Sequence, residues 1–158
     1  MQSNYDAVKQ FTEESSNIKC PTVPRKMSKD EVFFLLKMVS SEMTELAQTV
    51  TDSYDEALDM VKNSLDVDPS NHPKPNTDVE VAAEQGDAMV DAWYYMLNAA
   101  SKSGIDLSKI FDEVHDANMR KKDPVTGKFI RRNDGKILKP KGWTPSNIVK
   151  VVESMGKE

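Results

Sequence analysis

Three carboxylates in the middle of the chain share a spacing that could bind a metal ion. Glu84, Asp87 and Asp91 follow one another at intervals of three and four residues. An α-helix turns by about 100° per residue, so this spacing places the three side chains within about 60° of one another. No lysine or arginine occurs from Pro75 to Ser101, although exposed helix faces usually mix charges that pair at i,i+4. The row of acids therefore needs a counter-charge from elsewhere, and a divalent cation would supply it.

A second acidic pair lies earlier in the chain. Glu42 and Glu45 are three residues apart, and residues 38–61 also lack lysine and arginine. If the two acidic segments form antiparallel neighbouring helices, their carboxylates converge on one patch, as in helical bundles that bind metals. Carboxylates that close could not all stay ionised without a cation. A single pair of this kind is usually a solvated helix edge, but two acidic segments without cations favour a metal site.

The composition restricts such a site to metals with oxygen ligands. Cys20 is the single cysteine, which excludes a disulfide framework and a thiolate zinc site. The two histidines, His72 and His115, are far apart in the sequence, which argues against a histidine-based zinc site. Carboxylate ligands suit Mg²⁺, Mn²⁺ or Ca²⁺.

A basic segment near the C-terminus complements the acidic ones. Residues 119–142 contain nine lysines and arginines against two aspartates, and so carry a charge of +7. Because the whole chain has a net charge of −5, the remainder carries −12. This charge asymmetry bears on the kind of ligand that the protein binds, because the basic segment would attract an anion. The alternative is that most of these cations face water, as charge runs usually do, or form a weak nucleic-acid patch.

Length and hydropathy predict one domain without a membrane span. The chain has 158 residues, enough to bury a core, and we expect a single domain over residues 1–158. No apolar run approaches the roughly 20 residues that cross a bilayer. The first residues lack the basic-then-apolar order of a signal peptide. We therefore expect a cytoplasmic protein with no membrane partner.

Apolar periodicity and capping signals predict a mainly helical bundle. Apolar residues recur at intervals of three and four, the period of an α-helix. The predicted helices are a short one from Asn4, longer ones over about 28–51, 54–65 and 77–103, one from Asp106 or Ser108 to Met119, and one from Thr144-Pro145 to Met155. Ser28, Ser53 and Thr77 each precede a glutamate by three residues, the spacing of an N-terminal capping box.

The chain changes character after Lys122. Turn-forming residues alternate there with short apolar pairs at 129–130 and 137–138. They predict a small, basic β-hairpin tail over residues 123–143. Residues 1–27, interrupted by two prolines, are expected to form an N-terminal arm. The predicted fold class is therefore all-α, a helical bundle with a small hairpin tail.

The two acidic pairs resemble a known superfamily. E-x-x-E at Glu42 and Glu45, then E-x-x-D at Glu84 and Asp87 on the next long helix, is similar to the all-α nucleoside triphosphate pyrophosphatases. This superfamily includes MazG, the dimeric dUTPases, dCTP pyrophosphatase and the phosphoribosyl-ATP pyrophosphohydrolases. The stretches GIDLSKIFDEVHDANMRK and GKILKPKGWTPSNI look like the phosphoribosyl-ATP-pyrophosphohydrolase-like branch. The resemblance covers roughly residues 29–152.

The resemblance leaves two registers open for the central acids. Glu84-Gln-Gly-Asp87 matches the E-x-G-D form seen in MazG. Counted back from the downstream positions, Asp91 instead falls where the branch places its metal-binding aspartate, with Asp87 one turn earlier. Both registers keep the acids on one helix face, and we rank Asp91 and Asp87 above Glu84.

The resemblance implies Mg²⁺-dependent hydrolysis, with Mn²⁺ as an alternative ion, of a (deoxy)nucleoside triphosphate at the α–β bond. The products would be a nucleoside monophosphate and pyrophosphate, and the role would be control of nucleotide pools. It implies five metal ligands, Glu42, Glu45, Asp87, Asp91 and Glu84. Glu45 is also the candidate catalytic base that accepts a proton from the attacking water.

The resemblance also implies residues that bind the substrate. Lys121 and Lys139 match positions that contact phosphate, and Asn118 would bridge phosphate or metal. Tyr95, on the acidic side of the central helix, and Lys37, on the first long helix, are weaker candidates for substrate contact.

Two other functions remain open at the level of sequence. One is phosphoribosyl-ATP hydrolysis in histidine biosynthesis, and the other is a non-catalytic helical bundle that binds a nucleotide or metal. The full carboxylate set favours an enzyme, because a pure binder needs no spare base.

The central helix also bears on assembly. It carries its acids on one side and Met89, Trp93, Met96 and Leu97 on the other. A single neighbouring helix cannot cover both sides, and an uncovered apolar stripe is unusual on a monomer. We therefore expect a homodimer or a dimer of dimers, and no nucleic-acid partner.

Overall fold

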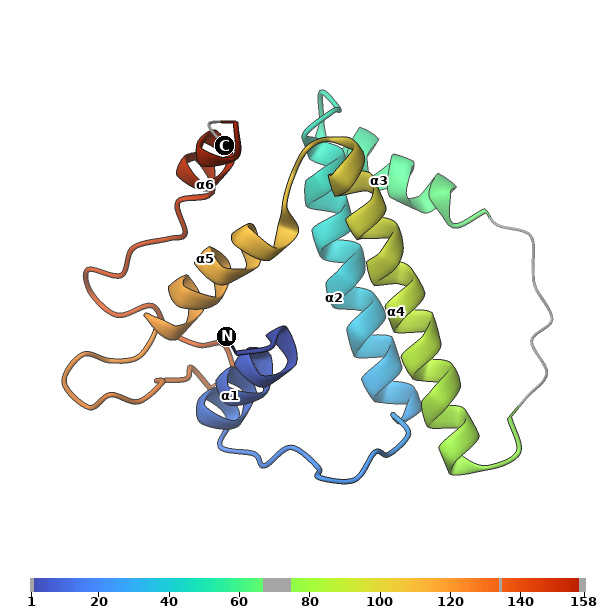
Figure 1. Ribbon diagram of the computed structural model, residues 1–158, viewed down its shortest axis with the longest axis horizontal. Helices are drawn as coiled ribbons and strands as arrows, with labels where there is room; N and C mark the ends of the chain where they lie inside the picture. The colour runs from blue at the N-terminus through green and yellow to red at the C-terminus, as the bar shows by residue number, and fades with distance from the viewer. Residues whose placement is uncertain (1, 67–74, 134, 157–158) are drawn as a thin grey trace. The chain divides into compact units, whose positions relative to one another are not determined.

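The computed structural model describes residues 2–66, 75–133 and 135–156, and six α-helices lie within them (Figure 1). They are α1 (Asn4–Ser16), α2 (Lys29–Gln48), α3 (Tyr54–Ser64), α4 (Asp78–Lys102), α5 (Leu107–Met119) and α6 (Ile148–Met155). The all-α prediction is confirmed, and the helix boundaries agree with the predicted ones to within a few residues. His72, named above as one of the two histidines, lies outside the described residues.

The chain forms two compact units. One consists of Pro24–Ala88, and the other of Met1–Val23 together with Met89–Glu158. We refer to them as the acidic unit and the basic unit. The acidic unit contains α2, α3 and the first part of α4, and the basic unit contains the rest of α4 with α1, α5 and α6. None of the helices in the described residues is long and apolar enough to cross a membrane.

In the acidic unit, α2 packs against α3 (Figure 1). The contact buries small residues, with Ala57 fully buried and Thr44 and Ala47 nearly so. Larger apolar side chains of α2 stay exposed, including Phe33 at 68% and Leu46 at 61%. This unit therefore buries a narrow seam and leaves much of its apolar surface uncovered.

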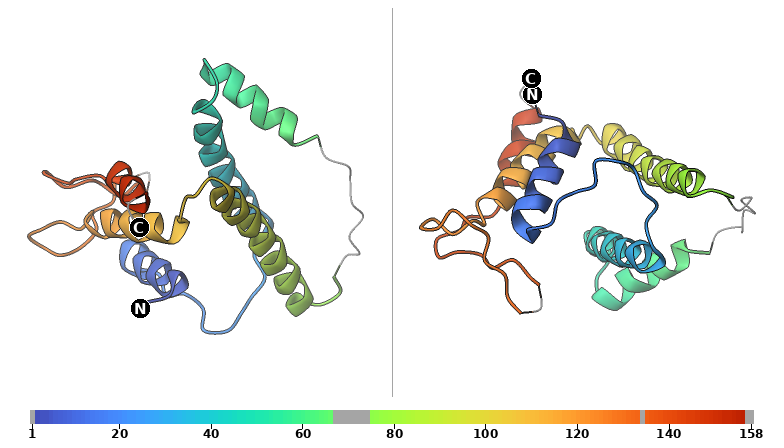
Figure 2. Two further views of the ribbon diagram at one scale, coloured as in Figure 1. Left: turned by 45° about the horizontal axis from the view of Figure 1, so that its top comes forward. Right: turned by 90° about the horizontal axis from the view of Figure 1, so that it is seen from below.

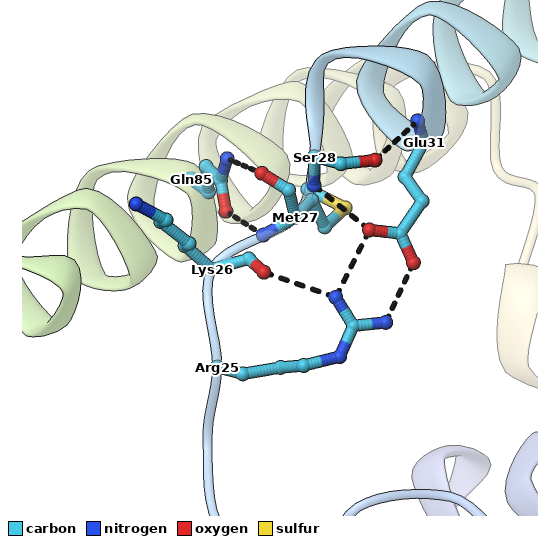
Figure 3. Close-up of polar contacts among 6 residues, drawn as sticks. All are labelled: Arg25, Lys26, Met27, Ser28, Glu31 and Gln85. Carbon is cyan, nitrogen blue, oxygen red and sulfur yellow. Dashed lines mark hydrogen bonds and ion pairs between the residues drawn. The ribbon is translucent and has the colours of Figure 1, made fainter.

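The capping boxes are formed where the spacing predicted them. Ser28 Oγ accepts a hydrogen bond from the Glu31 backbone N–H, and Glu31 accepts one from the Ser28 N–H (Figure 3). Thr77 and Glu80 form the same reciprocal pair at the start of α4. At α3 only half of the box forms, because Glu56 accepts from the N–H of Asp52 rather than from that of Ser53.

The chain segment before α2 is fastened to the start of α4. The Met27 N–H donates to Gln85 Oε1 at 2.7 Å, and Gln85 Nε2 donates to the Met27 carbonyl at 3.1 Å (Figure 3). Lys26 Nζ also lies 2.6 Å from Asp78 Oδ1. Because both contacts join the N-terminal ends of α2 and α4, the two helices begin side by side. Within the acidic unit, they do not form the antiparallel pair that would bring Glu42 and Glu45 to Glu84 and Asp87.

In the basic unit, α5 packs between α1 and α6 (Figure 2). Ala7 of α1 and Ala117 of α5 are buried. Lys122 Nζ forms an ion pair with Glu14 of α1, and Phe11 meets Phe129 edge to face at 5.4 Å between ring centroids. These contacts attach the segment after α5 to α1.

The predicted β-hairpin over residues 123–143 is not formed as a two-stranded ladder in the described residues. Only isolated antiparallel bridges occur, between Lys122 and Phe129 and between Arg131 and Ile137. Turn residues interrupt the segment too often for strands to extend, and the centre of the predicted turn at residue 134 lies outside the described residues. The tail is therefore an extended, bridged segment.

Two predicted helix starts are also corrected. Ser3, not Asn4, caps α1, and its side chain accepts from the Asp6 N–H. Asn147, not Thr144, caps α6, so Pro145 precedes the helix instead of occupying its first turn. At the other end of the central helix, Gly104 adopts the left-handed conformation expected of a residue that terminates a helix, with φ of 70°.

Candidate active site

The acidic pair of α2 lies far along its helix. Glu42 and Glu45 are both exposed, and Glu42 is thirteen residues beyond Lys29, the first residue of α2. At 1.5 Å per residue, Glu42 lies about 20 Å from the start of the helix. The first part of α4 is bonded to the segment just before that start, through Gln85 and Met27.

Glu84 and Asp87 of α4 lie near the opposite end of this span. Glu84 and Asp87 are neighbours of Gln85 in the sequence, and Asp91 follows one turn later on the same helix. All three are exposed. In the described residues of one chain, no group of three acids, histidines or cysteines could hold a metal ion. Within the acidic unit, Glu42 and Glu45 therefore lie well along α2 from Glu84 and Asp87.

The exposed acids have no cation of their own among the described residues. One cation reaches the acidic stretch of α4, because Lys26 pairs with Asp78 at the first residue of the helix. No ion pair within the described part of the chain involves Glu42, Glu45 or the three acids of α4. Their donor chemistry fits an oxygen-ligated divalent ion, since all five are carboxylates that form no ion pair with another described residue.

The basic side of the site is assembled within one chain. Lys121 Nζ donates a hydrogen bond to Asn118 Oδ1 at 2.7 Å. The same ammonium lies 5.8 Å from the centroid of the Trp143 ring, and Lys139 Nζ lies 4.4 Å from it. The structure thus brings two of the predicted phosphate-binding residues, Lys121 and Lys139, to one indole ring, and the third, Asn118, is bonded to Lys121. We call these three residues with Trp143 the lysine cluster.

The electrostatics of the lysine cluster favour an anion. Burial lowers the pKa of Lys121, and the nearby charges of Lys139 and Lys136 lower it further. An anion bound beside Lys121 would offset both effects by stabilising the charged ammonium. A phosphate oxygen is a suitable partner for a point charge of this kind.

A small cavity of about 150 Å³ adjoins the lysine cluster. Lys121, Lys139 and Asp123 line it together with Ile130, Leu138 and Pro140. Asp123 Oδ1 does not pair with the lysines, because it accepts hydrogen bonds from the backbone N–H groups of Val125 and Thr126 and from the Thr126 hydroxyl. The bonds from Thr126 are the main cause that lowers the pKa of Asp123. Its charge therefore stabilises the turn.

The weaker substrate candidates are found on exposed helix surfaces. Lys37 is exposed on α2, and Tyr95 is 74% exposed on α4. Neither joins the lysine cluster through a contact in the described residues. Trp93, expected in a core or subunit contact, is 51% exposed.

Two other side chains of the basic unit make local contacts. The Arg131 guanidinium donates to the backbone carbonyls of Ser15 and Gly135 and so ties the tail to α1. His115 stacks on Phe111 with ring planes 3° apart, as a structural residue would.

Sequence reasoning missed two residues that organise these regions. Trp143 had no assigned role, and its position beside the family-matched Lys139 was the available signal. Gln85 fastens the chain before α2 to α4, and no local pattern signals it because its partner Met27 is 58 residues away. Both act through contacts that are distant in sequence.

Comparison with known proteins identifies the family. A family model described as phosphoribosyl-ATP pyrophosphohydrolase matches residues 8–118, more than half of the chain. The chain belongs to this family. The matched residues include both acidic pairs and Asn118, and they end before Lys121. The family match thus begins earlier than the resemblance suggested and stops short of the basic tail.

A solved relative of the family has the same fold along nearly the whole chain. It is the crystal structure of an inferred NTP pyrophosphohydrolase from Exiguobacterium sp. 255-15, with a TM-score of 0.80 and 27% sequence identity. The alignment covers 99% of this chain and 98% of the other. No curated protein matches the chain significantly. The chain is thus a pyrophosphohydrolase, and enzymes of this family generally use divalent metal ions.

Proposed function

We propose that this pyrophosphohydrolase cleaves a (deoxy)nucleoside triphosphate between its α- and β-phosphates. The products are a nucleoside monophosphate and pyrophosphate, and the role is control of nucleotide pools in the cytoplasm. One observation carries the proposal: the chain aligns over 99% of its length with a protein described as an NTP pyrophosphohydrolase. The tail with Lys139 and Trp143, which lies beyond the family match, falls inside this longer alignment.

On the basic side, the lysine cluster binds the phosphates. Two ammonium groups near one indole ring provide charge for a polyphosphate, and Asn118 orients one of them by accepting its hydrogen bond. Lys121 and Lys139 then hold the phosphate chain and stabilise negative charge as the leaving pyrophosphate forms.

On the acidic side, the five carboxylates of α2 and α4 would hold Mg²⁺ or Mn²⁺. The bound ion would neutralise these acids and the substrate phosphates, which otherwise repel each other. Glu45 is the residue of this set that accepts the proton of the attacking water, because one carboxylate must remain free to act as a base. Glu42, Asp87, Asp91 and Glu84 serve as ligands.

A second copy of the chain would complete the acidic site. Within one acidic unit, the α2 pair lies about 20 Å along its helix from the end where α4 begins. Exposed apolar residues on α2, among them Phe33, Phe34 and Leu46, provide a surface for such a partner. In a symmetric homodimer, Glu42 and Glu45 of one copy would meet the α4 acids of the other. A dimer of dimers would repeat this arrangement.

The main alternative substrate is phosphoribosyl-ATP, which the description of the family model favours. Pyrophosphate release from a panel of dNTPs and NTPs, with phosphoribosyl-ATP as the comparison, tests the proposal. We expect turnover of at least one nucleoside triphosphate with a kcat/KM above that for phosphoribosyl-ATP. The reverse order would assign the enzyme to histidine biosynthesis. Nucleotide binding without any turnover would indicate a non-catalytic binding protein.

A further inference from the structure

Trp143 joins the tail to the end of α5. Its indole Nε1–H donates a hydrogen bond to the backbone carbonyl of Ala117 at 2.9 Å. Ala117 is buried, and it directly precedes Asn118 of the lysine cluster. The indole is half-buried. This bond sets the position of the ring relative to α5, the helix that carries Asn118 and ends just before Lys121.

The lysine cluster poses an electrostatic problem that the ring can solve. Lys121 and Lys139 carry like charges, and neither has an ion pair among the described residues. Asn118 provides an oxygen for Lys121 alone. Both ammonium groups lie within 6 Å of the Trp143 ring centroid, at 5.8 Å for Lys121 and 4.4 Å for Lys139. A tryptophan ring attracts cations in this range through the negative charge of its faces.

We infer that Trp143 is a positioning residue whose indole ring holds the ammonium groups of Lys121 and Lys139 together as a phosphate-binding pair. The inference rests on the proposed function, because it assigns the lysine cluster to the polyphosphate. Without the ring, the two lysines repel each other and their flexible side chains separate in solvent. The phosphate would then have to bring them together, and part of its binding energy would be lost.

A purely structural role for Trp143 makes a different prediction. The hydrogen bond to Ala117 could serve only to attach the tail to α5. In that case, the loss of the indole would lower stability, and its effect on phosphate binding would not depend on the lysines. A double-mutant cycle separates the two roles, because it measures whether two side chains act through each other.

The test uses the full-length protein and inorganic pyrophosphate as the probe, with binding measured by calorimetry. We expect Trp143→Leu to raise the Kd for pyrophosphate and the KM for the nucleotide by about tenfold, with kcat changed less. Trp143→Phe, which keeps an aromatic face, should have a smaller effect. Lys141→Ala, which removes an exposed lysine of the same segment, is the matched control and should leave both constants within about twofold.

The decisive measurement repeats Trp143→Leu in a Lys121→Ala/Lys139→Ala background. If the indole acts through the lysines, its removal there has little further effect on the Kd. An undiminished effect in that background would overturn the inference, and so would a wild-type Kd in Trp143→Leu itself. The proposed function would survive either result, since it fails only if the wild-type enzyme turns over no nucleoside triphosphate.

A second approach covers the case in which Trp143→Leu does not fold. Fluorinated tryptophan, incorporated in a Trp93→Phe background, keeps the shape and the N–H donor but weakens the negative charge on the ring face. The Kd for pyrophosphate should rise stepwise with the number of fluorine atoms. A Kd independent of fluorination would contradict the positioning role.

Discussion

The basic and acidic halves of the proposed site are built in opposite ways. The lysine cluster is complete within one basic unit, where Lys121 and Lys139 lie at the Trp143 ring and Asn118 accepts a hydrogen bond from Lys121. The acids of α2 and α4 are exposed, and those of α2 remain far from those at the start of α4. Both halves collect like charges, so the difference between them needs a physical cause.

The cause is the presence or absence of a compensating group. The lysines have an aromatic face and an amide oxygen to offset their repulsion, and a hydrogen bond to a buried residue holds that face in place. Glu42 and Glu45 of α2, and Glu84, Asp87 and Asp91 of α4, have no such group among the described residues. Because carboxylates repel one another without a cation, a site that depends on a metal ion and a second chain would leave these acids apart in a single chain.

The largest expected effect comes from the acidic half. Glu45→Gln should lower kcat by at least about a hundredfold, because it removes the proposed proton acceptor. The fold should be retained, since Glu45 is exposed and has no ion pair among the described residues. Steady-state kinetics with Mg²⁺ and circular dichroism check both expectations. Glu153→Gln, which changes an exposed acid of α6, is the control and should remain active.

Metal removal provides a companion test. Chelation should abolish turnover, and added Mg²⁺ or Mn²⁺ should restore it. Full activity after exhaustive chelation would contradict the metal-dependent role of the carboxylates.

The second test asks whether the acids of each site come from one copy of the chain or from two. Glu45→Gln and Asp87→Asn proteins should each be inactive alone. If each site combines α2 of one copy with α4 of the other, a mixed dimer contains one doubly altered site and one intact site. An exchanged equimolar mixture should therefore recover about a quarter of wild-type activity.

A matched control accompanies this mixing experiment. Mixing Glu45→Gln with Glu42→Gln, both on α2, leaves no intact site and should restore nothing. Native mass spectrometry would verify that mixed dimers form. Mixed dimers without activity in the Glu45→Gln/Asp87→Asn pair would place each acidic site within one copy. A monomer in sedimentation at micromolar concentration would exclude the shared site altogether.

A more moderate effect distinguishes the two registers of α4. If Asp91 binds the metal directly, Asp91→Asn should raise the Mg²⁺ concentration for half-maximal activity about tenfold more than Glu84→Gln does. The order reverses if the MazG-like register holds. Metal titrations of activity decide between them. Near wild-type behaviour of both Asp91→Asn and Asp87→Asn would remove α4 from the chemistry.

The smallest effect concerns the capping box that starts α2. The side-chain hydrogen bond from Arg25, and then the bond from the Ser28 N–H, lower the pKa of Glu31 from 4.5 to about 2. The carboxylate therefore stabilises the folded state above pH 4.5, and this contribution is lost as the pH falls toward 2. Glu31→Gln should lower the Tm at pH 7 by no more than about 4 °C, because the group is exposed.

The pH dependence sharpens this last prediction. The difference in Tm between wild type and Glu31→Gln should narrow as the pH falls from 5 to 3. Asp30→Asn, an exposed acid in the same helical turn, controls for the general effect of negative charge near a helix N-terminus. A Tm difference that stayed constant over this range would contradict the role of the ionised carboxylate.

Local structure was predictable from the sequence because the residues that interact within a helix or its cap are three or four positions apart. The Ser28–Glu31 and Thr77–Glu80 boxes, the period of α2 and α4, and the end of the central helix near Gly104 all depend on helix geometry alone. The acidic motifs were recognisable for the same reason. These short-range patterns were sufficient to indicate an all-α fold, and the resemblance of the acidic motifs to a known superfamily implied a pyrophosphohydrolase.

Only the tertiary structure decided which of these elements meet. Gln85 bonds to Met27 across 58 residues, Arg131 bonds to Ser15 across 116, and Trp143 bonds to Ala117 across 26. The first contact joins the chain before α2 to the first part of α4, the second ties the tail to α1, and the third places an indole beside two lysines. Such pairings follow from packing and from which polar groups find partners, and no helical period encodes them.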